Sequence, residues 1–315
     1  MQSLKINAPA KINLYLEIIG DREDGFHELA MVMQSIALAD EMEMVLSGNE
    51  AINVQCDRAD VPNDKTNLAY RAAALMAHKF PQQYGKYGGV EIAIRKHIPV
   101  AAGLAGGSTD AAAVLVGIDL LWELGLTQSE IAEIGAELGS DIPFCIAGGT
   151  AIATGRGEKL SPLLGLDNIY IVLGKHQSQA VSTAWAYKTY RTVYGESYIR
   201  DRNSLAARAA AVHSGEMVKA ILHRDVKEIA SKLYNDLEKV VLPEYAAVVE
   251  LKAAFAKAGA IGTIMSGSGP SVFAICESPQ HAQLVKQQVR SQIPDPDLEL
   301  FVTQMVSHGI QVVNN

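Results

Sequence analysis

A glycine-rich segment at residues 99–110, PVAAGLAGGSTD, joins a predicted strand to a predicted helix. The strand is Val90–Ile98, whose first five residues alternate apolar and polar side chains as a half-buried strand does. The helix is predicted at Ser108–Leu124, with Ser108 as its N-cap and Asp110 in its first turn. A helix that begins there directs its free N–H groups and its positive end at the loop. The arrangement predicts a site for an anion such as a phosphate group.

Three glycines give the loop the open backbone that such a site needs. Gly103, Gly106 and Gly107 have no Cβ atom, so a ligand can approach the main chain closely. No lysine precedes Ser108, which excludes a P-loop, and residues 105 and 108 are not glycine, which excludes the dinucleotide fingerprint GxGxxG. The alternative is a glycine-rich connection without a ligand. Ser-Thr-Asp at a helix start, directly after the glycines, favours the phosphate site.

Composition argues against several other classes of protein. The chain has 315 residues, 49% of them hydrophobic and 20% charged, which allows a large core and is typical of two domains. Its net charge of −8 argues against a nucleic-acid-binding protein, which would carry a basic surface. The N-terminus lacks the apolar region of a signal peptide, and no apolar run is long enough to span a bilayer. With three dispersed cysteines and no CxxC pair, we expect a reduced cytosolic protein without nucleic-acid or membrane partners.

The first half of the chain mixes predicted strands and helices. Strands are expected at Leu4–Ala8 and Ile12–Ile19, and a helix is expected at Asn67–Phe80. Thr127 and Glu130 have the spacing of a capping box, which predicts that another helix begins there.

The second half has the element order of a split-βαβ, or ferredoxin-like, domain. From residue 169 onward the predicted order is strand, helix, strand, strand, helix, strand. The predicted strands are Ile169–Leu173, Thr263–Met265, Ser271–Cys276 and Leu298–Val306, and the helices include Pro243–Ala258 and one that Ser278 begins. We therefore predict an α+β fold, with an N-terminal βα domain at residues 1–160 and a C-terminal ferredoxin-like domain at residues 161–315.

Three further segments hold candidate functional side chains. Lys11 and Asn13 lie two residues apart, which places both on one face of a strand, although a solvated face is the commoner explanation. Asp141 follows a helix end, where it can act as a base or a magnesium ligand, or can simply cap the next helix. Ser266–Ser271 is a turn of small residues that is either an ordinary hairpin or a second backbone element near the phosphates. None of these signals decides the function alone.

Together, three motifs resemble the GHMP kinase superfamily, which includes galactokinase and the homoserine and mevalonate kinases. The motifs are PAKINLYLEI at residues 9–18, PVAAGLAGGSTDAAA at residues 99–113 and GTIMSGSGPSVFAI at residues 262–275. The resemblance implies the two-domain fold of that superfamily and ATP-dependent phosphorylation of a small-molecule hydroxyl. The run GDREDGFHEL at residues 20–29, with GSDIP at residues 139–143, is similar to members with a cytidyl acceptor. Those members phosphorylate the 2-hydroxyl of 4-diphosphocytidyl-2-C-methyl-D-erythritol in the non-mevalonate pathway of isoprenoid synthesis.

The same resemblance implies roles for individual residues at the phosphate end. Asp141 would take the proton of the acceptor hydroxyl, Lys11 would orient Asp141 and stabilise charge, and Asn13 would hold the erythritol group. ATP would contact Asn67 and Lys96 near the adenine, and the loop residues Pro99, Val100, Ala101, Ala102, Gly103, Leu104, Ala105, Gly106, Gly107, Ser108 and Thr109. Magnesium would bridge phosphate oxygens with Ser108 nearby. The glutamate that ligates magnesium in many superfamily members has no clear equivalent in this chain.

At the acceptor end, the resemblance implies a pocket for a cytosine ring. Phe26 and Tyr187 would stack on its two faces, and His27 would hydrogen-bond to its edge. From these two residues alone, without the flanking motif, a core aromatic at Phe26 and a surface histidine at His27 are the better explanation.

Three other functions compete with this hypothesis. One is a GHMP kinase with another acceptor, such as homoserine or mevalonate, which the Gly25–His27 turn disfavours. Another is a non-catalytic nucleotide-binding regulator, which the presence of both Lys11 and Asp141 disfavours. The third is a nucleic-acid-binding domain, which the net charge disfavours. We expect a monomer or homodimer in the bacterial cytosol, or alternatively a mature plastid form.

Overall fold

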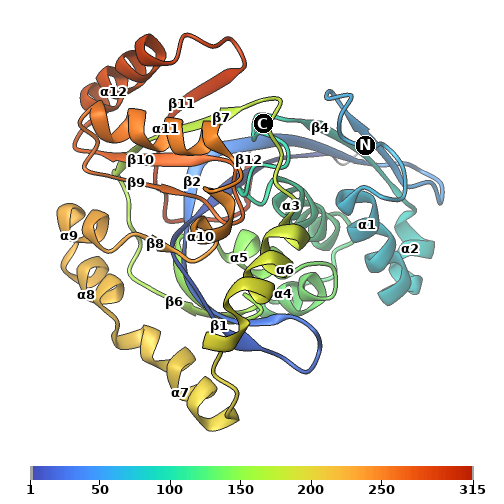
Figure 1. The fold of residues 1–315 in the computed structure, drawn as a ribbon. Helices are drawn as coiled ribbons and strands as arrows, with labels where there is room; N and C mark the ends of the chain where they lie inside the picture. Colours follow the sequence, from blue (N-terminus) through green and yellow to red (C-terminus); the bar gives the residue numbers. More distant parts are fainter. Residues whose placement is uncertain (1–2, 314–315) are drawn as a thin grey trace.

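The computed structural model describes residues 3–313 as an α+β protein built on two β-sheets, as the sequence predicts (Figure 1). The strands of the larger sheet are β1 (Ser3–Asp21), β2 (His27–Leu46), β3 (Asn53–Cys56), β4 (Val90–Arg95), β5 (Thr150–Gly155), β6 (Lys159–Pro162), β8 (Tyr234–Asn235) and β12 (Gln311–Val313). The strands of the smaller sheet are β7 (Tyr170–His176), β9 (Gly262–Met265), β10 (Val272–Cys276) and β11 (Leu298–Gln304).

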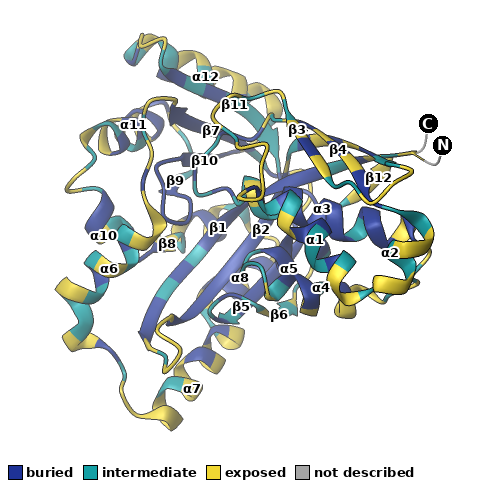
Figure 2. Ribbon diagram, turned by 90° about the vertical axis from the view of Figure 1, so that its right-hand side faces the viewer, coloured by how far each residue is buried: buried dark blue, intermediate teal, exposed yellow. Residues whose placement is uncertain are grey.

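The helices cover the outer faces of the two sheets. In chain order they are α1 (Leu68–Lys79), α2 (Pro81–Tyr87), α3 (Gly106–Leu121), α4 (Gln128–Ala136), α5 (Ile142–Ala147), α6 (Thr183–Tyr194), α7 (Arg202–Ala211), α8 (Glu216–His223), α9 (Val226–Ser231), α10 (Glu238–Val241), α11 (Ala246–Lys257) and α12 (Pro279–Gln292). Helix α3 packs on β1 and α1, whereas α11 and α12 pack on the smaller sheet. Figure 2 shows that β1 and β2 are largely buried, while helices such as α7 and α12 expose their outer faces.

The two sheets pack against each other through an apolar core. Ile12 and Leu14 of β1 belong to the same buried cluster as Leu173 of β7 and Phe273 of β10. Burial of such large apolar side chains is the main favourable contribution to folding. The core therefore holds the N-terminal and C-terminal halves in a defined relative position, and the candidate site lies where they meet.

Strand β1 is longer than the sequence predicts. It runs without a break from Ser3 to Asp21, beside β2, instead of forming two separate strands. Its pairing register shifts at three points, one of them between Pro9 and Lys11. A β-bulge lets a strand pass a proline without a regular ladder hydrogen bond, so the predicted gap at residues 9–11 is wrong.

The smaller sheet confirms the ferredoxin-like prediction. Its strand order is β11-β7-β10-β9, and all neighbouring strands are antiparallel. The prediction of Leu298–Val306 as the last strand is wrong, because β12 follows and pairs with β1 at residues 5–7. Strand β8 also joins the larger sheet, in parallel with β1. Residues beyond 160 therefore contribute to both sheets, and the boundary at 160/161 stays a prediction.

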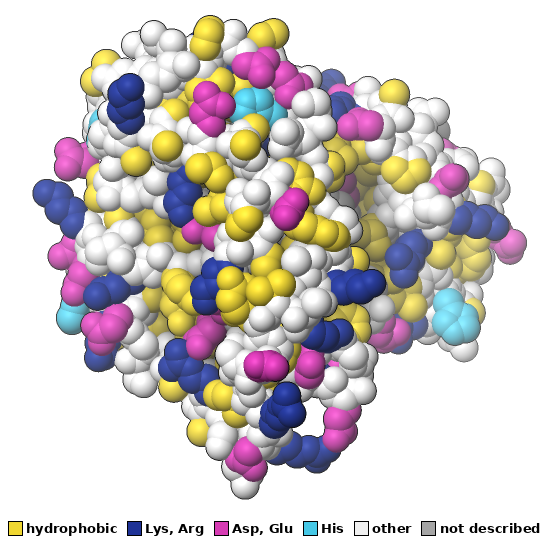
Figure 3. Space-filling model, in the orientation of Figure 1, with side chains coloured by type: hydrophobic (Ala, Val, Ile, Leu, Met, Phe, Trp, Pro, Cys, Tyr) yellow, Lys and Arg dark blue, Asp and Glu magenta, His cyan; other side chains and the backbone are white. Residues whose placement is uncertain are grey.

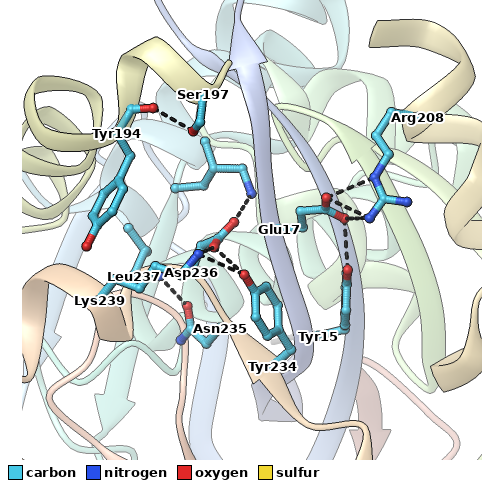
Figure 4. A network of polar contacts seen from close by, with 11 residues as sticks. Tyr15, Glu17, Tyr194, Ser197, Arg208, Tyr234, Asn235, Asp236, Leu237 and Lys239 are labelled. Carbon is cyan, nitrogen blue, oxygen red and sulfur yellow. Dashed lines mark hydrogen bonds and ion pairs between the residues drawn. The ribbon is translucent and has the colours of Figure 1, made fainter. Parts of the chain in front are cut away.

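A network of polar contacts fastens β8 to β1 (Figure 4). The rings of Tyr15 and Tyr234 lie side by side, with centroids 5.4 Å apart. The Asp236 carboxylate accepts hydrogen bonds from the Ile18 N–H at 2.7 Å and from the Tyr234 hydroxyl at 2.6 Å. Because Asp236 is buried, these bonds satisfy a charge that would otherwise be costly. They hold residues 234–237 beside the first strand.

Local capping rules placed several helix ends correctly. Asn67 caps α1 by accepting a hydrogen bond from the Ala69 N–H, and Ser278 caps α12 in the same way. Both hydrogen bonds of the predicted capping box between Thr127 and Glu130 are present at α4.

Two predicted helix starts are wrong. Helix α3 begins at Gly106 with Ala105 as its N-cap, so Ser108 and Asp110 lie inside the helix. Helix α11 begins at Ala246 rather than at Pro243, because a short helix, α10, ends just before the proline.

Between residues 3 and 313, no helix combines the length and the apolar character that crossing a bilayer requires.

Candidate active site

A cavity of about 910 Å³ opens where the glycine-rich loop, β1, α6 and the turn at residues 266–271 meet. Figure 3 shows this face of the molecule, with a hollow lined by hydrophobic atoms and lysine or arginine side chains at its edge. The predicted site residues that line the cavity are Lys11, Asn13, Phe26, His27, Asn67, Lys96, Pro99, Val100, Ala101, Ala102, Gly103, Ala105, Gly106, Gly107, Ser108, Asp141 and Tyr187. Segments far apart in the sequence therefore share one cavity.

Two residues predicted to bind ATP lie elsewhere. The side chains of Leu104 and Thr109 are buried in the protein and do not line the cavity. Leu104 instead accepts a hydrogen bond at its carbonyl from the Lys11 N–H, at 3.1 Å. This bond ties the loop to β1 and helps to set the position of Lys11.

The loop backbone has the conformation of an anion-binding site. Ala101, Gly103 and Ala105 take positive φ angles of 50°, 74° and 59°, each separated by one residue with an ordinary φ. Alternation of this kind turns successive N–H groups toward one side, and α3 then adds its own free N–H groups. Two alanines in the left-handed region cost conformational energy, which the surrounding structure must offset.

The turn at residues 266–271 packs directly against this loop. A Cβ atom on Gly103 would overlap the Ser266 carbonyl oxygen, so only glycine fits there. The Ser266 hydroxyl also donates a hydrogen bond to the Gly103 carbonyl at 3.2 Å. Thus the turn does more than connect β9 and β10, because it supports the loop from the other half of the molecule.

Gly103→Ala is therefore expected to lower kcat/KM by about 10²-fold, the cost of a displacement near 1 Å in a positioned site. The added methyl group clashes with the Ser266 backbone and strains a positive φ. Steady-state kinetics and thermal unfolding measure the effect. Gly85→Ala in α2 is the matched control, because a Cβ atom at that position would meet no other atom within 4 Å. Wild-type kinetics in Gly103→Ala would show that the tight packing at the turn is not needed.

Lys11 and Asp141 lie close together in the wall of the cavity. The Lys11 ammonium lies 3.7 Å from the Asp141 carboxylate and donates a hydrogen bond to the Asn13 side chain at 2.7 Å. The Asp141 side chain makes no capping hydrogen bond to α5, which removes the structural explanation for this residue. A carboxylate and an ammonium beside an anion loop can respectively take a proton and stabilise negative charge.

Sequence reasoning missed a residue that supports this cluster from β8. The side-chain amide of Asn235 donates hydrogen bonds of 2.8 Å to the carbonyls of Met265 and Gly267. Gly267 packs beside Lys11 and Asn13, since a Cβ atom there would lie within 3.4 Å of both side chains. Nothing in the local sequence signals this role, because Asn235 and the turn are brought together only by the fold.

The other end of the cavity is aromatic. His27 and Tyr187 have ring centroids 5.2 Å apart, and the Tyr198 ring lies nearly perpendicular to His27 with its centroid 5.7 Å away. Phe26 is half exposed and lies under the Arg156 guanidinium, 5.2 Å from ring centroid to charge. Tyr187 and Phe26 both line the cavity, and Tyr187 also packs on His27.

His27 itself carries an unused polar atom. Its Nε2 is buried without a hydrogen-bond partner among residues 3–313, and the Asp21 carboxylate is 3.7 Å away. Burial lowers the pKa of His27, and the nearby Arg191 charge lowers it further. A neutral imidazole offers one donor and one acceptor, which suits the edge of a pyrimidine.

One face of α6 adds basic groups that the sequence analysis missed. Ala184, Tyr187, Lys188 and Arg191 recur at intervals of three and four residues and all line the cavity. This spacing places all four residues on one face of a helix, and it could have identified the two cations from the sequence. Together with Arg156, the two cations place positive charge at the aromatic end.

Lys96 does not have a free ammonium group. It is buried between the carboxylates of Asp40 and Asp110, with the Asp110 bond at 2.8 Å. Burial acts to lower the pKa of Lys96, but the two carboxylates outweigh it and the pKa is raised. Burial in turn raises the pKa of Asp110. The ammonium anchors the first turns of α3 beside the loop and is occupied by these two partners.

The donor set for a metal ion is sparse. Within residues 3–313, no group of three or more histidine, cysteine or acidic side chains is placed to hold a metal. The Ser108 hydroxyl and the Asp141 carboxylate line the cavity, whereas Asp110 is engaged by Lys96. Magnesium binds to proteins through one or two such oxygens plus phosphates and water, so these residues fit that ion.

Comparison with known protein families shows to which family this chain belongs. Residues 67–149 match the GHMP kinases N terminal domain, and residues 217–295 match the GHMP kinases C terminal domain. The chain belongs to the GHMP kinase family. The first match contains the glycine-rich loop and Asp141, and the second contains the turn at residues 266–271 that supports the loop.

Relatives of this GHMP kinase align over its whole length. A protein of Trichormus variabilis named 4-diphosphocytidyl-2-C-methyl-D-erythritol kinase is 67% identical and is matched over 100% of both chains. A crystal structure of 4-(cytidine 5'-diphospho)-2C-methyl-D-erythritol kinase has a TM-score of 0.75 at 29% identity, covering 96% of this chain and 99% of that one. A homoserine kinase from Cytophaga hutchinsonii has a TM-score of 0.72 at 20% identity, covering 99% and 98%, and shares the fold.

Proposed function

We propose that this GHMP kinase transfers the γ-phosphoryl group of ATP to the 2-hydroxyl of 4-diphosphocytidyl-2-C-methyl-D-erythritol. The products are ADP and the 2-phosphate, an intermediate of the non-mevalonate pathway to isopentenyl diphosphate. The proposal rests on one observation above all. A single cavity joins an anion loop, a Lys11–Asp141 pair and an aromatic pocket, in which a buried histidine nitrogen has no hydrogen-bond partner among the described residues. The full-length relatives that carry this name support the same acceptor.

The reaction needs positioning and charge stabilisation more than covalent help from the protein. Asp141 accepts the proton of the 2-hydroxyl while that oxygen bonds to the γ-phosphorus. The bond between the γ-phosphorus and the β–γ bridging oxygen breaks, and ADP leaves with that electron pair. Lys11, 3.7 Å from Asp141, orients that carboxylate and stabilises the developing negative charge on the acceptor oxygen.

The glycine-rich loop and the start of α3 hold the β- and γ-phosphates by main-chain N–H groups. Asn67 and Lys96 line the same cavity and would lie near the adenine. Magnesium would be held near Ser108, and when bound it would neutralise phosphate charge.

At the other end, the cytosine stacks beside Phe26 and Tyr187 and bonds to His27. Asn13, hydrogen-bonded to Lys11, would hold the erythritol group. The acceptor thus spans from the aromatic pocket to Asp141.

A kinase assay with a panel of acceptors tests the proposal. Purified protein, ATP and magnesium are incubated with the cytidyl acceptor, homoserine, mevalonate or galactose, and ADP release is followed. We expect turnover with the cytidyl acceptor and only background ADP with the other three. Turnover of homoserine or mevalonate in its place would overturn the assigned acceptor. ATP binding without turnover of any acceptor would favour a regulator.

His27→Ala is expected to raise the KM for the cytidyl acceptor by about tenfold, the worth of a hydrogen bond lost in a buried site. The KM for ATP should change little, because His27 lies at the aromatic end of the cavity. Steady-state kinetics with each substrate varied in turn measure both constants. His223→Ala, at the exposed end of α8, is the control. Equal increases in both KM values would remove His27 from the cytosine pocket.

We also propose that the enzyme works in the bacterial cytosol as a monomer or homodimer. Support comes from the bacterial source of the full-length relatives such as the Trichormus variabilis protein. Sedimentation of the purified protein distinguishes the two oligomeric states.

A further inference from the structure

Arg191 joins two parts of the molecule at the acceptor end of the cavity. It lies in the last turn of α6, and its guanidinium points to the connection between β1 and β2. Its Nε donates a hydrogen bond to the Asp21 carboxylate at 2.7 Å, and its Nη2 donates one to the Gly25 carbonyl at 2.9 Å. A planar guanidinium with two fixed donors defines the position of both partners.

Those two partners flank the residues that would bind the cytosine. Asp21 ends β1, and Gly25, with a φ of 84°, directly precedes Phe26 and His27. Residues 23–26 of this connection are exposed, so contacts from α6 matter for its position. Arg191 therefore fixes the turn that carries Phe26 and His27 against the helix that carries Tyr187.

The same contact governs charge around His27. The charged and titratable groups that face the imidazole are Asp21 at the end of β1, Arg191 and Tyr187 on α6, and Tyr198 beyond α6. Asp21 alone would favour the protonated imidazole, since its carboxylate is 3.7 Å from Nε2. Arg191 pairs with that carboxylate and so opposes protonation of His27.

We propose that Arg191 is a positioning residue for the acceptor pocket, which holds the Phe26–His27 turn in place and pairs with the Asp21 carboxylate beside His27. This inference rests on the proposed cytidyl acceptor for its kinetic effect. Its effect on His27 in the free protein is independent of which acceptor the enzyme uses. The two readouts therefore separate a failure of this inference from a failure of the proposed function.

The test uses two variants of the full chain. Arg191→Met removes both the charge and the two hydrogen bonds. We expect it to raise the KM for the cytidyl acceptor by at least about tenfold, with the KM for ATP unchanged and kcat changed less. The pKa of His27, followed by NMR titration of the ligand-free protein, should rise, because Asp21 is left unopposed. Arg191→Lys keeps the positive charge but lacks the planar pair of N–H donors. It should therefore hold the His27 pKa near the wild-type value and restore the acceptor KM only in part.

Arg202→Met is the matched control, because Arg202 pairs with Glu23 in the same connection but does not line the cavity. It should match the wild type in both readouts. The inference is overturned if Arg191→Met leaves both the acceptor KM and the His27 pKa unchanged, or if Arg202→Met changes them equally. A raised KM with an unshifted His27 pKa would overturn the charge role of Arg191. Should Arg191→Met fail to fold, Arg191→Lys still decides, since a wild-type acceptor KM there would contradict the positioning role.

Discussion

Replacing Asp141 with asparagine is expected to lower kcat by about 10²- to 10⁴-fold, the range that a positioned general base contributes. Asparagine keeps the shape of the side chain, but its amide is too weak a base to take the proton of the acceptor hydroxyl. The KM for ATP should stay close to wild type, because no residue of the glycine-rich loop changes. Steady-state kinetics with each substrate varied at saturating levels of the other measure both quantities.

Glu250→Gln is the control for Asp141→Asn. Glu250 lies on the exposed side of α11, so the substitution makes the same chemical change far from the cavity. Wild-type kcat is expected there, and urea unfolding should confirm that both variants are folded. If Asp141→Asn turned over at nearly the wild-type rate, the acceptor would lose its proton to another group, and Asp141 would not be the base.

Replacing Lys96 with methionine is expected to lower the free energy of unfolding by about 3–5 kcal/mol, the cost of breaking a buried ion pair from one side. The substitution leaves the carboxylates of Asp40 and Asp110 buried next to each other without a cation. Asp40 would retain its bonds from the main-chain N–H groups of His97 and Ile98, which do not neutralise its charge. Urea unfolding followed by circular dichroism measures the loss.

The pH dependence of that loss identifies its cause. Burial already raises the pKa of Asp110, and removing the Lys96 charge raises it further, above the value in the unfolded chain. A carboxyl group whose pKa is higher in the folded than in the unfolded state lowers the stability of the protein most at pH values above the folded-state pKa. The penalty in Lys96→Met should therefore be larger near pH 8 than near pH 5.

Lys79→Met provides the comparison for a partly exposed ion pair. Lys79 pairs with Glu137 at 2.7 Å near the surface, so its loss should cost less than about 1 kcal/mol. A loss in Lys96→Met no greater than that in Lys79→Met, or one independent of pH, would mean that water reaches the Asp40–Lys96–Asp110 cluster.

Lys96 also shows where inference from sequence fails. As a cation just before the glycine-rich loop, it is an obvious candidate for a nucleotide contact. One of its two partners is Asp40, which lies 56 residues earlier in β2, and no spacing in the sequence predicts that pairing. Ser108 was misplaced as the cap of α3 for a related reason. The loop takes a left-handed conformation at Ala105, which is unfavourable for alanine by itself and is imposed by the surrounding packing.

Local patterns in the sequence were enough to predict the loop between a strand and a helix, the ferredoxin-like order of elements, and the shared face of Lys11 and Asn13. Such features depend on side-chain periodicity and on glycine, which act over a few residues. The tertiary structure decided that Asp141 lies beside Lys11, that β12 returns to β1, and that Arg191 reaches Asp21. These contacts join distant segments through packing and charge, and they form only once the whole chain has brought those segments together.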